Sequence, residues 1–205
     1  MNISNLIHDE DGGAYTLSYM MAIPVLVLLL CVVVETTLMM SAKVGTVFAA
    51  YSGVRTGVVW SSASRNWSDA EDRIREAAIR SFVPFAAGTK PSGGSGMAVD
   101  SAAYAKAYAE FAKTPVSKGY VQSKFENAAG LIKVTTSGRP SKFDSPLSVT
   151  VEYRFQFRLP GIGKLFGEVG PNGDYYVPLE STATLQNEGP QNSSQTLGIG
   201  YGTFE

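Results

Sequence analysis

The chain has 205 residues and a formal net charge of −1 at pH 7, from 17 Lys and Arg against 18 Asp and Glu. Without a cluster of basic residues it is not suited to neutralising phosphates, so we expect no nucleic-acid partner. One histidine (His8) and one cysteine (Cys31) exclude an intrachain disulfide and argue against Cys/His catalysis, a Ser-His-Asp triad and most zinc sites. We therefore expect no enzymatic activity, no metal and no cofactor.

The first predicted element is an apolar helix near the N-terminus. The 21 residues Ala14–Val34 include no Asp, Glu, Lys, Arg or His. As an α-helix they span about 31 Å, which is enough to cross the hydrocarbon core of a bilayer. A helix that is apolar on every face over this length is typical of a transmembrane segment.

Three features distinguish this segment from a generic anchor. Gly12-Gly13 precedes it, Pro24 lies within it, and Glu35 ends it. Here the chain resembles the TadE-like minor pilins and pseudopilins of the tight-adherence (Flp-type) branch of type IV pili. That family has a leader ending in Gly, then an acid followed by an aromatic residue, a proline, and a second acid. Tyr19, Pro24 and Glu35 hold the last three places, whereas Ser18 replaces the first acid.

The resemblance implies processing and assembly. It implies cleavage between Gly13 and Ala14 by a prepilin peptidase. It also implies that the mature chain is a single-pass protein of the cytoplasmic membrane with an extracytoplasmic C-terminal domain, or that it is incorporated into a pilus. The implied partners are other pilin subunits, the inner-membrane assembly platform and membrane lipid.

An uncleaved single-pass anchor presenting a non-enzymatic binding domain to the cell envelope is the alternative. It is compatible with the acidic residues Asp9, Glu10 and Asp11 before the diglycine, because leaders of this family are usually basic. A cleaved secretory signal peptide fits less well, because its n-region is basic and its apolar region is shorter.

After Glu35 the pattern predicts that the helix continues in amphipathic form. Apolar residues recur in steps of three and four at Val44, Val47, Phe48, Tyr51, Val54 and Val58. The other face carries small residues, including Gly45, Ala49, Gly53 and Gly57. We expect the Val/Phe/Tyr face to pack on the chain's own domain and the small face to contact helices of other subunits. Intramolecular packing of this helix is the simpler alternative.

The middle of the chain is predicted to be helical. Ser68-x-x-Glu71 matches a capping box for a short helix that ends before Pro84. An Ala/Tyr-rich helix follows Asp100, and a weaker helix is expected over Tyr120–Ala129. We interpret residues 85–130 as a variable helical insertion.

The last third changes to the period of two that is typical of strands. Apolar and polar residues alternate over 147–159 and again over 177–186, and 131–136 is a further short strand. Between the two longer strands, Ile162, Leu165 and Phe166 form either an exposed apolar knuckle or a segment folded back onto the sheet, and we favour the second.

These elements predict an α+β fold in which one long N-terminal helix packs on an antiparallel sheet of three or four strands, with extra helices inserted. The expected divisions are a leader (1–13), a transmembrane helix (14–35), an exported pilin-like domain (36–188) and an irregular tail (189–205).

Overall fold

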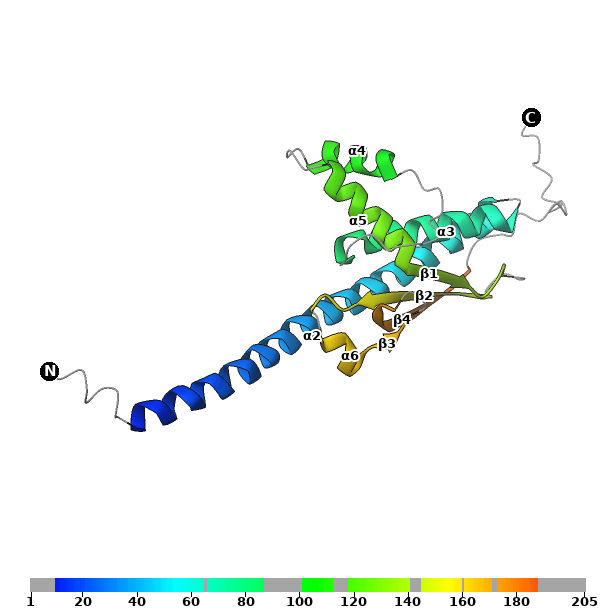
Figure 1. The fold of residues 1–205 in the computed structure, drawn as a ribbon. Coiled ribbons are helices and arrows are strands. Elements are labelled where there is room, and N and C mark those ends of the chain that lie inside the picture. The colour runs from blue at the N-terminus through cyan, green and yellow to red at the C-terminus, as the bar shows by residue number, and fades with distance from the viewer. Residues whose placement is uncertain are drawn as a thin grey trace, which may run out of the picture.

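A computed structural model describes residues 10–64, 66–86, 101–112, 118–140, 145–159, 161–170 and 173–187, with the side chains of the first helix described from Thr16 onward. The predicted α+β fold is confirmed (Figure 1). The helices are α2 (Glu10–Ala63), α3 (Trp67–Phe82), η1 (Val83–Phe85), α4 (Ser101–Ala112), α5 (Lys118–Leu131) and α6 (Ile162–Phe166). The strands are β1 (Ile132–Thr136), β2 (Pro146–Gln156), β3 (Glu168–Val169) and β4 (Tyr175–Gln186).

Helix α2 organises the molecule because it runs without a break from the predicted membrane segment into the folded domain. Its N-terminal half extends away from the rest of the chain, and its C-terminal half is covered by the sheet and by α3 (Figure 1). The charge-free part lies entirely in the extended half, and most of its side chains are exposed. This is the one helix among the described residues that is long and apolar enough to cross a membrane.

The sheet is antiparallel with strand order β1-β2-β4-β3. The predicted alternation in β2 is confirmed, because one face of this strand is completely buried. That face consists of Leu147, Val149, Val151, Tyr153 and Phe155. Helices α2 and α3 cover it, so the core lies between one helical layer and one sheet. On the other face, Thr150 and Thr182 share a hydrogen bond of 2.8 Å across β2 and β4.

Helix α4 packs on α5, and α5 packs on α3 and η1 (Figure 1). Tyr104 of α4 lies 4.8 Å from Phe125 of α5, measured between ring centroids. Phe125 and Ala128 in turn belong to the main core. The described part of the 85–130 region therefore extends the hydrophobic core through α5, with aromatic side chains joining α4 to it.

The predicted capping box of α3 is wrong. The N-cap residue is Asn66, with no side-chain cap hydrogen bond, and Ser68 lies inside the first turn. The carboxylate of Glu71 instead accepts hydrogen bonds from the Trp67 indole at 2.7 Å and from the Thr136 hydroxyl at 3.0 Å. Glu71 therefore links the start of α3 to the end of β1, a long-range partner that the local motif could not show.

Candidate functional site

The junction between the extended half of α2 and the folded domain is formed around Glu35. This side chain is only 2 % exposed, although it follows directly after the apolar segment. Its Oε1 accepts hydrogen bonds from the backbone N–H of Arg158 at 2.8 Å and of Leu159 at 2.7 Å. One carboxylate oxygen therefore holds Arg158 and Leu159, the segment just after β2, against the surface of α2.

The position of this contact follows from the directions of α2 and β2. A Cβ on Gly57 would touch Leu147 at the start of β2, whereas Glu35 binds the residues just after its end. The helix rises about 33 Å between Gly57 and Glu35, and the strand covers about 36 Å between Leu147 and Arg158. β2 therefore runs antiparallel to the part of α2 between Glu35 and Gly57, and Glu35 marks the end of the domain nearest the apolar segment.

The second oxygen of this carboxylate, Oε2, is buried and has no hydrogen-bond partner among the described residues. Burial of a carboxylate is costly unless hydrogen bonds compensate it. The two N–H groups that donate to Oε1 come from consecutive residues and offset part of that cost. Such charge-assisted bonds are stronger than neutral ones, so the junction is a strong local constraint.

The other residues of the pilin-like motif are not brought near Glu35. Ser18, Tyr19 and Pro24 lie on the extended half of α2, and all three are exposed, Tyr19 at 68 %. Gly13 and Ala14 lie in the first turns of the same helix, where the backbone alone is described. The motif residues before Glu35 thus lie on the exposed half of α2, whereas Glu35 itself is buried against the folded domain. The expected leader falls mainly outside the described residues, as does the expected tail from 189 onward.

The small face of α2 does not face outward as expected. Gly45, Ala49, Gly53 and Gly57 are all buried within the chain's own domain. A Cβ on Gly45 would lie 2.5 Å from Cβ of Phe85, and one on Gly57 would lie 2.5 Å from Cδ2 of Leu147. The prediction that these four residues form an interface with other subunits is therefore wrong for the folded chain. Their small size lets α2 approach η1, α3 and β2 closely.

The opposite expectation, that the Val/Phe/Tyr face packs on the domain, is also wrong for most of its members. Val44, Val47, Phe48 and Tyr51 are 49–56 % exposed, and Met40 on the same side is 61 % exposed. Val54 and Val58 at the end of the pattern are the exceptions, with Val54 fully buried. We call the five exposed residues the α2 stripe. They form an exposed apolar surface on the part of α2 that follows the apolar segment.

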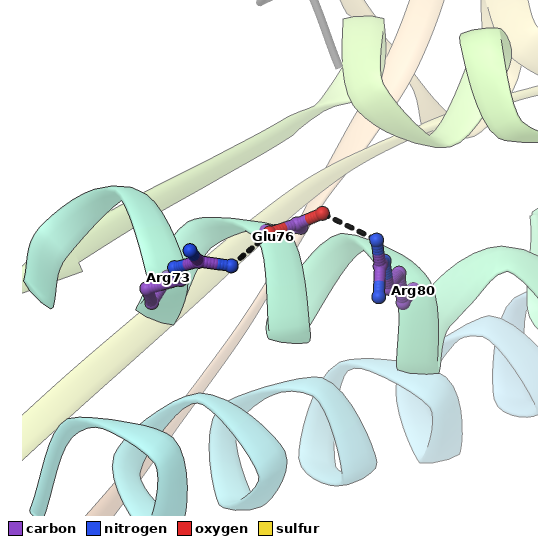
Figure 2. Close-up of polar contacts among 3 residues, drawn as sticks. All are labelled: Arg73, Glu76 and Arg80. Atoms are coloured by element: carbon purple, nitrogen blue, oxygen red, sulfur yellow. Dashed lines mark hydrogen bonds and ion pairs between the residues drawn. The ribbon is translucent and has the colours of Figure 1, made fainter. Parts of the chain in front are cut away.

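A shallow groove of about 510 Å³ runs between α2 and α3. Its lining includes Trp60 and a row of charged residues on α3. Glu76 lies between Arg73, at 3.8 Å, and Arg80, with which it forms an ion pair and hydrogen bond (Figure 2). The Arg73 guanidinium also lies 5.1 Å from the centroid of the Trp60 ring. Both arginines are thus engaged along the helix, as expected for a solvated helix surface.

The described residues contain no group of three or more His, Cys, Asp or Glu side chains that could hold a metal ion. Comparisons with known protein families, curated proteins and solved structures find no match. The site with the most specific geometry in this chain is therefore the Glu35 junction, where a membrane-length helix is joined to a folded domain.

Proposed function

We propose that this chain is a non-enzymatic structural subunit, a TadE-like minor pilin or pseudopilin, that is cleaved after Gly13 and assembled from the cytoplasmic membrane. The observation that supports this most is the continuity of α2. One helix provides an exposed apolar N-terminal half and a C-terminal half that is packed on an antiparallel sheet. This arrangement suits a subunit that is stored in a bilayer and then packed through its apolar helix against other subunits.

The α2 stripe supports assembly in a second way. It adds about three turns of exposed apolar side chains to α2 in the region flanked by the domain. The exposed residues Thr36 and Thr37 separate it from the apolar segment. A neighbouring subunit could therefore contact two apolar surfaces on one helix, one on each side of this threonine pair. In this proposal the partners are other pilin subunits and the inner-membrane assembly platform. The α2 stripe, and not the small residues Gly45, Ala49, Gly53 and Gly57 that the sequence suggested, forms the interface with them.

Processing provides the direct test. The full chain is expressed in cells with an active prepilin peptidase, and the intact mass of the purified membrane protein is measured. We expect the mature chain to begin at Ala14. Gly13→Leu should retain the leader, because a large side chain obstructs a site into which a bare backbone fits.

A cell with an inactivated peptidase is the control, and its product should keep the leader. If the wild-type chain still begins at Met1 or Asn2 when the peptidase is active, the pilin proposal fails. The second candidate function is an uncleaved anchor that presents a binding domain to the cell envelope. The acidic residues before Gly13 and the presence of Ser18 favour it, because both depart from the pattern of the pilin family.

A further inference from the structure

Three large apolar side chains are exposed at the end of the domain nearest the apolar segment. Leu165 and Phe166 of α6 are 65 % and 63 % exposed, and Val169 of β3 is 67 % exposed. We call these three residues the α6 knuckle. The prediction that this segment folds back onto the sheet is confirmed for Ile162, which is buried, but is wrong for Leu165 and Phe166.

The knuckle is held by packing and backbone pairing. Gly161 begins the turn into α6 with a φ of +94°, a conformation that suits glycine. A Cβ on the buried Gly163 would lie 2.6 Å from Cβ of Tyr175, so α6 sits directly on β4. Strand β3 pairs with β4 through the register Val169↔Tyr175. The fold therefore fixes the apolar side chains in outward positions.

The Glu35 junction places the knuckle at the end of the predicted membrane segment. Arg158 and Leu159, which bind Glu35, lead into α6 within a few residues. One turn earlier on the same side of α2, Cys31 and Val32 are half-buried, whereas Val33 and Val34 are more than half exposed. The folded part of the chain therefore reaches the last turn of the apolar segment. Because that segment is only about as long as a bilayer core is thick, this end of the domain must meet the bilayer surface.

We propose that the α6 knuckle inserts into the head-group region of the bilayer that α2 crosses. Exposed apolar groups of this size mark an interaction surface, and lipid is the partner that the position next to the membrane segment provides. Tyr175 and Tyr176 lie half-buried at the same end, a position where tyrosine is frequent in membrane proteins. The knuckle gives the domain a second attachment, which fixes its tilt and its rotation about α2.

The charges at this end indicate what kind of lipid surface is required. The basic residues Arg154, Arg158 and Lys164 are accompanied by the acidic residues Glu168 and Asp174, and all five are exposed. Arg154 belongs to this group because its guanidinium lies 5.5 Å from the centroid of the Tyr176 ring. Three basic and two acidic residues leave a small net charge of +1 (3 − 2), so insertion depends mainly on apolar area and only weakly on attraction to anionic lipid. We therefore expect the same docking in vesicles of pure phosphatidylcholine and of phosphatidylcholine mixed with phosphatidylglycerol.

This inference rests on the membrane-spanning part of the proposed function, and not on cleavage or pilus assembly. The test uses the full chain in such vesicles with an environment-sensitive fluorophore on a single cysteine. The native Cys31 reports on the membrane span itself. Leu165→Cys and Asp72→Cys, each in a Cys31→Ser background, report on the knuckle and on the second turn of α3 at the far end of the domain. Quenching is compared between iodide in water and a nitroxide on an early acyl carbon of the lipid.

We expect the lipid nitroxide to quench the label at 165. We also expect iodide to quench the label at 165 severalfold less than it quenches the label at 72. Adding Phe166→Ser and Val169→Ser should release it to iodide, whereas Val59→Ser, a matched change of an exposed apolar residue, should not. If iodide quenches the label at 165 as strongly as the label at 72, the docking proposal is overturned. Protection of the label at 165 from both iodide and lipid also overturns it, because this result indicates that protein covers the knuckle. A Cys31 label that iodide quenches and lipid does not quench shows that the span itself is absent, which separates the two failures.

Discussion

Glu35 shows how one residue can join two parts of a protein with different surroundings. Its neighbours Val33 and Val34 are exposed apolar side chains, and four residues later Met39 already packs against the core. The carboxylate stays buried because it receives the N–H groups of Arg158 and Leu159 where β2 has ended. Those backbone donors have left the sheet ladder and need an acceptor, which Glu35 provides.

We predict that Glu35→Ala lowers the free energy of unfolding of the domain by about 2–4 kcal/mol, because two part-buried N–H groups lose their acceptor and the buried side chain leaves a space. Glu35→Gln keeps an acceptor oxygen and should cost less. Denaturant unfolding of the full chain in detergent, followed by the fluorescence of Trp60 and Trp67, measures both. Thr36→Ala is the control, since the exposed Thr36 hydroxyl bonds only its own helix at Val32. Equal stabilities of Glu35→Ala and the control would show that the junction contributes nothing.

At the scale of elements, α2 is one helix with two different roles. From Thr16 to Val34 nearly all of its side chains are exposed. From Ala42 onward one side of the helix is made of small residues and is buried. Phe85 and Leu147 fill the space that Gly45 and Gly57 leave empty. Glycine is unfavourable inside a helix, so its repeated use here is explained by close packing with α3, η1 and β2.

We predict opposite outcomes for alanine at two of these glycines. Gly53→Ala brings Cβ to 3.2 Å from Cγ1 of Val149, and the gain in helix propensity of about 1 kcal/mol should offset the crowding. Gly45→Ala brings Cβ to 2.5 Å from Cβ of Phe85, and overpacking of about 1–3 kcal/mol should exceed that gain. The same unfolding measurement should therefore find Gly45→Ala the less stable protein, and the reverse order would contradict the close approach of η1.

At the scale of the whole molecule, three apolar regions among the described residues bear on the proposed function. One is the core between the helices and the sheet, a second is the apolar segment of α2 with the α6 knuckle beside it, and the third is the α2 stripe. The stripe lies beyond the junction, so a bilayer crossed by the first half of α2 would not cover it. In the proposed function this surface is left for neighbouring subunits.

We predict that the double substitution Val44→Ser and Val47→Ser reduces incorporation into the fibre while the free energy of unfolding changes by less than about 1 kcal/mol, because both side chains are about half exposed. Incorporation is measured as the share of labelled subunit in sheared pili. Phe111→Ser is the control, since Phe111 on α4 is 87 % exposed and lies off α2. If the double variant enters fibres as well as this control, the stripe is not an assembly surface.

The sequence by itself determined the features that depend on local pattern. The charge-free run Ala14–Val34 predicts a membrane-length helix because helix length and composition are properties of the segment alone. The alternation over residues 147–155 predicts a strand with one buried face, and that face is fully buried in the sheet. The helices of the 85–130 region were likewise visible in the sequence.

Only the tertiary structure decided which side of α2 is buried. Residues 41–58 carry a small face and a Val/Phe/Tyr face, and periodicity shows that two faces exist without saying which one meets the sheet. The small face is buried because it lets the backbone of α2 lie close to β2 and α3, while the larger residues of the stripe stay outside. The partners of Glu35 are likewise 123 and 124 residues away, a separation that no local pattern spans. The exposure of the α6 knuckle was likewise decided by tertiary contacts, the packing of Gly163 on Tyr175 and the pairing of β3 with β4.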